Sequence, residues 1–131
     1  MNNFIFDNST KVIFGKGCVR EHLPEFLKQY GHTVMLAYGG GSIKKNGVYD
    51  EVTGILAAAG KQIVEFSGIM PNPTYAKVQE GAALARRENV ELILAVGGGS
   101  VMDCSKAVSL AARYDGDAWN DFWRYQGIVD F

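Results

Sequence analysis

Residues 92–100 read Leu92-Ile93-Leu94-Ala95-Val96-Gly97-Gly98-Gly99-Ser100, a wholly apolar run of strand length that ends in three glycines. The same arrangement occurs earlier in the chain, where Val34-Met35-Leu36-Ala37-Tyr38 leads into Gly39-Gly40-Gly41-Ser42. A continuous apolar run of this length is typical of a parallel strand that is covered on both faces. The two stretches therefore predict two buried strands, each followed by a tight turn into a helix.

Helical patterns alternate with these strands. One helix is expected over residues 48–59, with its apolar residues on one face, and Gly60 ends it. Residues 62–66 form a further strand, and Thr74 is placed to cap a helix that contains Val78, Ala82, Leu84 and Ala85. A last helix follows the second glycine triplet. Alternating strands and helices predict an α/β fold of three layers, with a Rossmann-like parallel sheet between helices.

The N-terminal region predicts a β-hairpin and a short helix. Apolar and polar residues alternate loosely over residues 4–14, and Asp7-Asn8-Ser9-Thr10 in the middle is typical of a turn. A helical pattern follows at Leu23, Phe26, Leu27 and Tyr30, and Gly31 ends it. Pro24 fits this helix if it lies in the first turn, where its missing N–H is not needed.

Composition excludes several classes of function. The chain has 131 residues, 13 basic and 14 acidic side chains and a net charge of -1, so we expect one domain and no nucleic-acid partner. No apolar run approaches the roughly 18 residues that span a bilayer, so we expect no membrane partner. Residues 1–7 lack the features of a secretory signal, and two cysteines cannot form a disulfide scaffold. We therefore expect a cytoplasmic protein with reduced thiols.

The two glycine triplets are the strongest indication of a binding site. They hold six of the 16 glycines, and ligands of such sheets bind at the carboxyl ends of the strands. Glycine lets an anion approach the backbone, and a helix N-terminus offers free N–H donors. Neither triplet continues to the Gly-Lys-Ser/Thr of a P-loop, and Met102 breaks the strict Rossmann fingerprint. The triplets indicate a phosphate or dinucleotide site; the alternative is two tight turns that bind nothing.

The role of Ser100 and Asp103, which follow the second triplet, has two interpretations. Ser100 and Asp103 nearly match a capping box, whose acidic member is usually Glu. Alternatively, Asp103 faces the reactive end of a bound cofactor or substrate. Because a carboxylate beside a diphosphate is repelled, both interpretations require Asp103 to point away from the phosphates.

Charged residues near the first triplet bear on the choice of cofactor. Lys44 and Lys45 suit a terminal phosphate, although paired lysines are also ordinary solvated surface. Glu65 lies near the end of the second strand, where an acidic residue holds a ribose hydroxyl in a conventional dinucleotide site, and it favours NAD. His22 and His32 have no partner at metal-ligand spacing, so no metal site is predicted within the chain.

Four motifs, in this order, resemble the iron-containing (group III) alcohol dehydrogenases, and most closely the branch of NADPH-dependent aldehyde reductases and butanol dehydrogenases. The motifs are Phe14-Gly15-Lys16-Gly17, the segment from Tyr38 to Lys45, Pro71-Asn72-Pro73 and the segment from Ala95 to Asp103. The resemblance covers essentially the whole chain but only the N-terminal third of a family member. It implies that residues 1–131 are the N-terminal dinucleotide-binding domain of a dehydroquinate synthase-like fold, without the C-terminal helical metal-binding domain.

The resemblance also implies a role for each motif. Gly97 to Ser100 would hold the cofactor pyrophosphate, Asp103 would approach the nicotinamide, and Gly39 to Ser42 would lie by the adenosine ribose. The NAD-preferring branch has an Asp in that first loop; the glycines and lysines here imply NADP(H), against the indication from Glu65. The expected cofactor-binding residues are Gly39, Gly40, Gly41, Ser42, Lys44, Lys45, Pro71, Asn72, Gly97, Gly98, Gly99, Ser100 and Asp103. The iron or zinc ligands of the family, an Asp and three His, would all lie beyond Phe131.

The function implied is hydride transfer between NADP(H) and a small alcohol or aldehyde by a metal-dependent, homodimeric full-length enzyme, with this fragment alone inactive. One alternative is a stand-alone nucleotide- or phosphate-binding module without catalysis. Another is a glycerol dehydrogenase-type relative that uses NAD.

Overall fold

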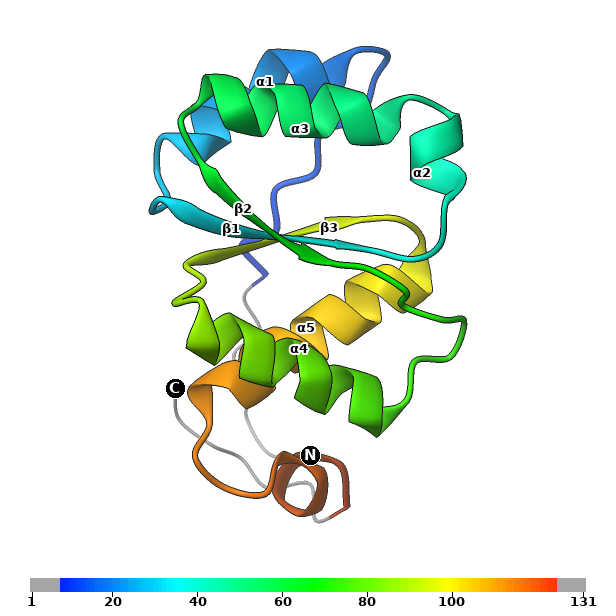
Figure 1. The fold of residues 1–131 in the computed structure, drawn as a ribbon, viewed down its shortest axis with the longest axis vertical. Helices are drawn as coiled ribbons and strands as arrows, with labels where there is room; N and C mark the ends of the chain where they lie inside the picture. The colour runs from blue at the N-terminus through cyan, green and yellow to red at the C-terminus, as the bar shows by residue number, and fades with distance from the viewer. Residues whose placement is uncertain (1–7, 125–131) are drawn as a thin grey trace, which may run out of the picture.

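The structure is a computed structural model that describes residues 8–124. Its centre is a parallel sheet with strand order β2-β1-β3, in which β1 is Thr33–Tyr38, β2 is Gln62–Phe66 and β3 is Leu92–Val96. Helices α1 (Cys18–Leu27) and α3 (Val48–Ala58) cover one face, and α4 (Tyr75–Arg87) and α5 (Gly99–Arg113) cover the other (Figure 1). This arrangement confirms the predicted three-layer α/β fold.

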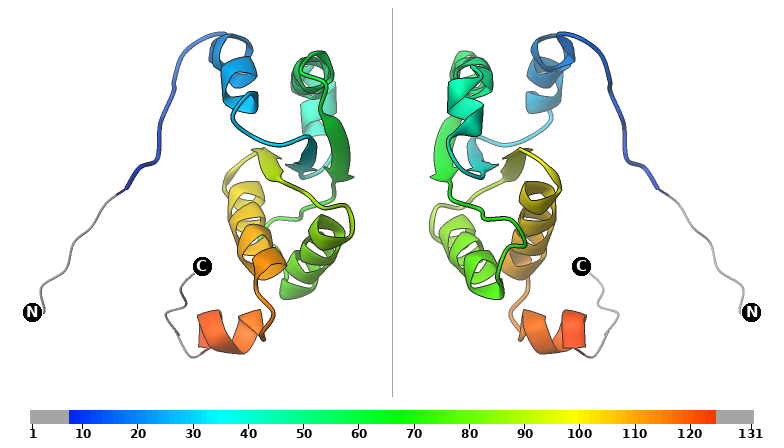
Figure 2. Two further views of the ribbon diagram at one scale, coloured as in Figure 1. Left: turned by 90° about the vertical axis from the view of Figure 1, so that its left-hand side faces the viewer. Right: turned by 90° about the vertical axis from the view of Figure 1, so that its right-hand side faces the viewer.

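Two shorter elements lie outside the main layers. Helix α2 (Ser42–Lys45) lies between β1 and α3, and a π-helical turn, η1 (Trp119–Arg124), follows α5. Figure 2 shows η1 beyond the layer of α4 and α5, far from α1. None of the helices within residues 8–124 has the length and apolarity needed to cross a bilayer.

Strand β1 lies between two hydrophobic cores, which explains its continuous apolar sequence. All six of its residues are buried. Leu36 packs with Leu27 and Leu56 on the side of α1 and α3, whereas Met35 packs with Phe66 on the side of α4 and α5. Since successive side chains of a strand point to opposite faces, a strand between two helical layers needs apolar residues at every position.

Strand β3 is as apolar as β1 but remains half-buried along its whole length. It forms one edge of the sheet and pairs with β1, Leu94 lying beside Leu36. Its side chains pack against both cores, as the sequence predicts. Their residual exposure follows from the edge position, because no further strand of the described residues lies beside β3.

The predicted N-terminal hairpin is wrong for the residues that the structure describes. Residues 4–7 lie outside that range, and residues 8–14 form no strand. They are exposed, with Phe14 at 99%, and run away from the body of the molecule (Figure 2). Loose alternation does not make a hairpin on its own, because two strands without further packing are only marginally stable.

Helix α1 begins earlier than the sequence pattern predicts. Gly17, in the left-handed conformation with φ 79°, starts it, and Glu21 N–H donates to the Gly17 carbonyl at 3.1 Å. Pro24 therefore lies inside the helix and not in its first turn, which corrects the prediction. A proline there removes one helical N–H, and the helix ends shortly afterwards, at Leu27.

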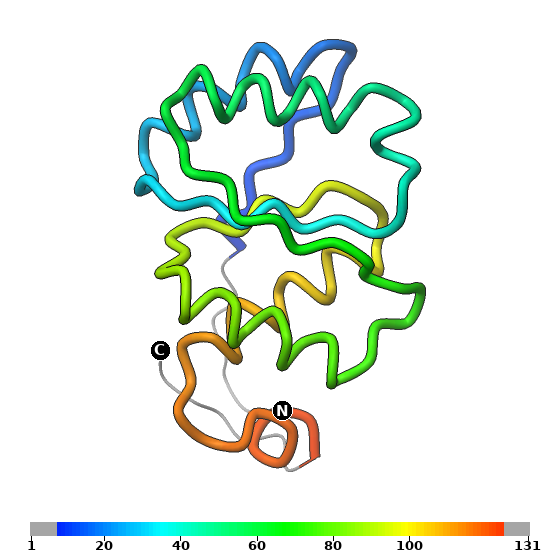
Figure 3. Tube along the Cα trace, viewed as in Figure 1, coloured from blue at the N-terminus to red at the C-terminus, as the bar shows by residue number. Residues whose placement is uncertain are grey.

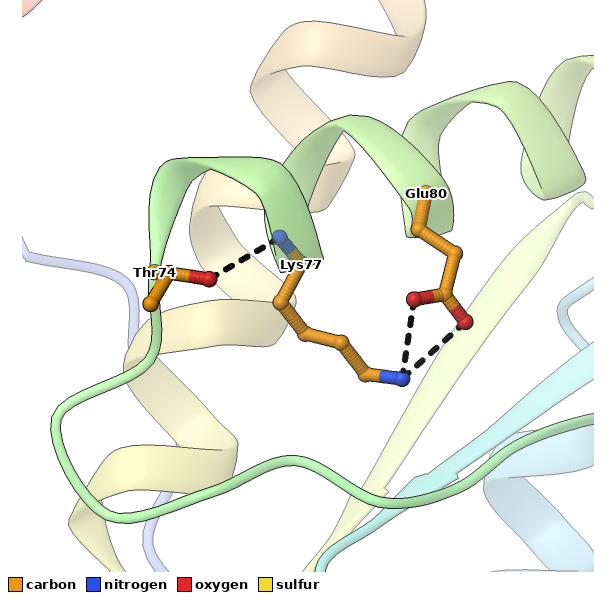
Figure 4. Close-up of polar contacts among 3 residues, drawn as sticks. All are labelled: Thr74, Lys77 and Glu80. Carbon is orange, nitrogen blue, oxygen red and sulfur yellow. Dashed lines mark hydrogen bonds and ion pairs between the residues drawn. The ribbon is translucent and has the colours of Figure 1, made fainter.

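Helix α4 confirms the predicted cap and packs closely on α5. The Thr74 hydroxyl accepts a hydrogen bond from the Lys77 backbone N–H at 3.3 Å, as Figure 4 shows. A Cβ at Gly81 would lie 2.7 Å from Val108 and 2.8 Å from Phe66. Glycine at this position therefore brings α4 close to both α5 and the sheet.

Candidate functional site

The loops that follow the three strands meet at one edge of the sheet. In Figure 3 the chain turns at this edge after each strand. Gly68 N–H donates to the Gly39 carbonyl at 2.9 Å, which joins the loop after β2 to the first glycine loop. Val101 lies close to both glycine loops, 3.8 Å from a Cβ built at Gly39 and 2.6 Å from one at Gly97. The structure therefore brings the two glycine triplets together, as the parallel sheet predicts.

The second glycine loop opens directly into α5. Gly98 is the N-cap in an extended conformation, with φ −85° and ψ −167°, and no side chain of the described residues caps the helix. The Gly98 carbonyl accepts from the N–H groups of Val101 and Met102 at 3.0 and 3.1 Å. The N–H groups of Gly99 and Ser100 have no acceptor within residues 8–124. Free donors and the positive end of a long helix together suit an anion.

This geometry corrects the capping-box prediction. Helix α5 begins at Gly99, so Ser100 already lies in its first turn and is not the N-cap. Its hydroxyl cannot reach the free N–H groups in the way that an N-cap side chain does. Asp103 is therefore not a capping partner of Ser100.

At four positions of the two triplets, the packing of the protein does not require glycine. Gly97 and Gly39 are required, because a Cβ would lie 2.6 Å from Val101 and 3.1 Å from the Ile69 carbonyl oxygen, respectively. At the other four, no heavy atom of the described residues lies within 4 Å of a built Cβ, and φ is outside the left-handed region. These four are Gly40, Gly41, Gly98 and Gly99. The space that their side chains would fill is not occupied by the described residues, so the backbone there is accessible to a ligand.

The two lysines after the first triplet have different surroundings. Both are exposed, and both backbone N–H groups donate to the Gly41 carbonyl at 3.2 Å. The Lys44 ammonium lies over two rings, 4.5 Å from the centroid of Tyr49 and 5.4 Å from that of Tyr38. Lys45 takes part in no ion pair or ring contact within residues 8–124. Lys44 is thus held in place, whereas Lys45 is exposed at the surface.

Glu65 is engaged by two tyrosines. Its carboxylate accepts a hydrogen bond from the Tyr38 hydroxyl at 2.6 Å and another from the Tyr49 hydroxyl. These two bonds lower the pKa of Glu65 below its ordinary value, and the nearby Lys44 lowers it further. The bond to Glu65 raises the pKa of Tyr49 to about 12. We call Tyr38, Lys44, Tyr49 and Glu65 the tyrosine–carboxylate cluster.

Asp103 lies on α5 beyond the free N–H groups and lines a cavity of about 190 Å³ between α4, α5 and η1. Its neighbours in the lining include Pro73 from the loop after β2, and the aromatic residues Tyr75, Trp119 and Trp123. Pro71 and Asn72 are exposed in the same loop, where Asn72 has a positive φ of 51°. The structure thus places a carboxylate of α5 beside an aromatic cavity.

Three further residues of this region were not predicted from the sequence. Val101 packs against both glycine loops, and Tyr49 completes the tyrosine–carboxylate cluster. Lys77 has a side chain only 10% exposed; its ammonium pairs with Glu80 at 3.0 and 3.1 Å (Figure 4) and lies 4.6 Å from the Phe66 ring centroid. Spacing along the chain could have indicated only the Lys77–Glu80 pair, since residues three apart are neighbours on a helix.

The described residues do not fit a metal centre. Within residues 8–124, no three His, Cys, Asp or Glu side chains lie close enough together to hold a metal ion. No chemical step through a metal can therefore be derived from this part of the chain.

A parallel sheet between two helical layers, with a free helix N-terminus and two glycine loops at the carboxyl ends of its strands, defines a three-layer α/β domain. The chain belongs to a particular family of such proteins, iron-containing alcohol dehydrogenase, whose sequence pattern matches residues 9–130.

Two relatives are similar over most of this chain. "Probable NADH-dependent butanol dehydrogenase 2" of Bacillus subtilis is 53% identical over 122 residues, which is 93% of this chain and 31% of the relative. "NADPH-dependent aldehyde reductase YqhD" of Escherichia coli is 43% identical over 117 residues, 87% of this chain and 28% of the relative. The chain therefore spans about a third of the length of these relatives.

A solved structure of a relative has the same fold. The NADH-dependent butanol dehydrogenase A of Thermotoga maritima is similar with a TM-score of 0.83 and 48% identity, over 93% of this chain and 31% of that one. The predicted membership of the iron-containing alcohol dehydrogenases is confirmed.

Proposed function

We propose that residues 1–131 are the cofactor-binding domain of a metal-dependent oxidoreductase, which transfers a hydride between NADP(H) and a small alcohol or aldehyde. The observation that supports this most strongly is the open space at four glycines of the two loops, two of which, Gly98 and Gly99, lie at the free N-terminus of α5. Family membership supports the reaction class, and it alone supports the metal, iron or zinc, which would be bound outside the described residues.

The proposal assigns a role to each loop at the carboxyl ends of the strands. The N–H groups of Gly99 and Ser100 bind the pyrophosphate, and Gly98 lets it approach the backbone. When bound, the nicotinamide donates or accepts the hydride. Asp103 and the aromatic cavity lie beyond the pyrophosphate position along α5, where they orient the nicotinamide or the substrate. Lys44 and Lys45 lie after the other glycine loop and contact the 2′-phosphate of NADP(H).

The proposal also covers the cellular location and the oligomeric state of the whole protein. We place it in the cytoplasm, because both cysteines of the chain are free thiols. We also propose a homodimer of the full-length enzyme, since assembly covers apolar side chains as exposed as Phe14, at 99%.

The proposal is tested by titrating the full-length protein with NADP+ and NAD+ and comparing the two dissociation constants. We expect tighter binding of NADP+, and a loss of that preference in the double variant Lys44→Ala/Lys45→Ala. Tighter binding of NAD+ that the double variant leaves unchanged would exclude the NADP assignment. Binding of neither dinucleotide would exclude the function itself.

The second candidate is the same reaction with NAD(H). Two observations favour it: Glu65 lies near the end of β2, and the Bacillus subtilis relative is described as NADH-dependent. The Escherichia coli relative, described as NADPH-dependent, favours the first candidate. The titration above separates the two candidates.

A further inference from the structure

The tyrosine–carboxylate cluster joins four elements at the edge where the cofactor is proposed to bind. Tyr38 is the last residue of β1 and directly precedes the first glycine loop, while Lys44 lies on α2, Tyr49 on α3 and Glu65 on β2. The Tyr38 and Tyr49 rings meet edge to face, with centroids 5.8 Å apart. The lysine therefore lies over a two-ring platform whose hydroxyl groups both donate to one carboxylate.

Resting on the proposed function, we infer that Glu65 is a specificity-determining residue: it compensates the charge of Lys44 and so weakens the binding of a 2′-phosphate without weakening the binding of NAD+. The sequence alone assigned Glu65 a different task, that of holding a ribose hydroxyl. In the structure its carboxylate already accepts from two tyrosine hydroxyls, which fix it beside Lys44.

The charges of the cluster explain the direction of this effect. An ammonium over two ring faces and near a carboxylate is partly compensated before any ligand arrives. The tyrosine hydroxyls hold the carboxylate in this position, so Lys44 attracts a phosphate less strongly than an uncompensated lysine does. NADP+ and NAD+ differ only by that phosphate, so the charge of Glu65 should affect one dissociation constant and not the other.

The neighbouring lysine makes the inference specific. Lys45 is exposed and has no carboxylate partner within residues 8–124, so it is the uncompensated charge of the loop. Glu65 therefore moderates a preference that Lys45 provides. Glu65 acts through Lys44, which makes it a positioning residue and not a catalytic one.

The test measures the dissociation constants of NADP+ and NAD+ for the full-length protein and for three variants. Glu65→Gln keeps the shape and hydrogen-bonding capacity of the side chain but removes its charge. We expect NADP+ to bind about 1.5- to fivefold more tightly, the range for a partly exposed charge pair, and NAD+ to bind unchanged. In the double variant Lys44→Met/Glu65→Gln, the shift relative to Lys44→Met should fall to less than half.

A matched control is Glu51→Gln. Glu51 lies on α3 like Tyr49, but it pairs with Arg20 at 3.1 Å, away from the cluster, so its neutralisation should leave both constants unchanged. Thermal unfolding of each variant shows whether the fold is intact.

Three results would overturn the inference. If Glu65→Gln leaves both constants unchanged or weakens both equally, Glu65 has only a structural role. If the shift toward NADP+ is undiminished in the Lys44→Met background, Glu65 does not act through Lys44. If the unmodified protein binds neither dinucleotide, the proposed function fails together with the inference, and that result is distinct from the other two.

Discussion

The two glycine loops have the same sequence pattern but different support. The second loop leads into α5, a helix of 15 residues whose first N–H groups are free, and no charged cluster of the described residues backs it. The first loop leads into α2, a helix of four residues, and the tyrosine–carboxylate cluster lies beside it. A long helix offers N–H groups and a dipole to any anion, whereas a cluster of side chains distinguishes one ligand from another. We therefore assign affinity to the second loop and selectivity to the first.

The largest expected effect follows from placing a carboxylate at the second loop. In Gly98→Asp the side chain can cap α5, since Gly98 is the extended N-cap and its Cβ meets open space. The carboxylate then occupies the anion position, so we expect both NADP+ and NAD+ to bind more than about 100-fold more weakly. The melting temperature should stay the same or rise. Retained binding in a folded variant would show that the pyrophosphate lies elsewhere.

Gly97→Ala tests the structural part of the same loop. A Cβ there would lie 2.6 Å from Val101, so the turn between β3 and α5 must open. We expect a loss of about 1–3 kcal/mol in the free energy of unfolding, measured by denaturant titration. Gly98→Ala is the matched control and should not destabilise the fold, because its Cβ meets nothing. Equal stability of the two variants would contradict the distinction between glycines needed for packing and glycines needed for a ligand.

A third substitution asks whether the first loop selects the cofactor. Gly40→Asp brings a carboxylate to a position where a built Cβ meets open space and φ is unstrained. We expect NADP+ to bind about tenfold more weakly, because its 2′-phosphate is repelled, and NAD+ to bind nearly unchanged. The measurement is the ratio of the two dissociation constants. If both weaken together, as in Gly98→Asp, the two loops do not divide affinity and selectivity between them.

Local sequence patterns account for what could be predicted about these loops. An apolar run followed by glycines indicates a buried strand and a turn whatever the rest of the chain does, and Thr74 caps α4 as its position predicts. The capping-box interpretation of Ser100 and Asp103 is wrong because Gly98 provides an N-cap through its backbone conformation, which no side-chain pattern reveals. The hairpin over residues 4–14 was predicted from a loose alternation, and the described part of that segment, residues 8–14, forms no strand.

The tyrosine–carboxylate cluster depends on strand register and could not be predicted. Glu65 pairs with Leu36 across β1 and β2, which places its side chain on the face of α3 beside Tyr38. A shift of one residue would send it to the other face, toward α4. Sequence alone gave Glu65 a place near a strand end, but its two hydroxyl partners come from elements whose packing only the structure shows.

The smallest expected effect concerns the pH dependence of that cluster. The pKa of Tyr49 is about 12, above its ordinary 10, so the fold favours the protonated hydroxyl. Its contribution to stability is therefore complete below pH 10 and is lost as the pH rises through about 12. At the acidic end the lowered pKa of Glu65 has the opposite sign, and its contribution is lost as the pH falls below the ordinary value of that carboxyl. Between these limits the cluster should be intact.

Tyr49→Phe isolates the alkaline part of this dependence, since it keeps the ring under Lys44 and removes the hydroxyl that donates to Glu65. We expect the variant to be less stable than the unmodified protein at neutral pH, and the difference to shrink as the pH rises from 10 to 12, measured by chemical unfolding. Tyr30→Phe, at an exposed tyrosine outside the cluster, should show no such convergence. A constant difference across this range would mean that the Tyr49–Glu65 bond does not form. The first loop would then lack the charge arrangement on which its proposed selectivity depends.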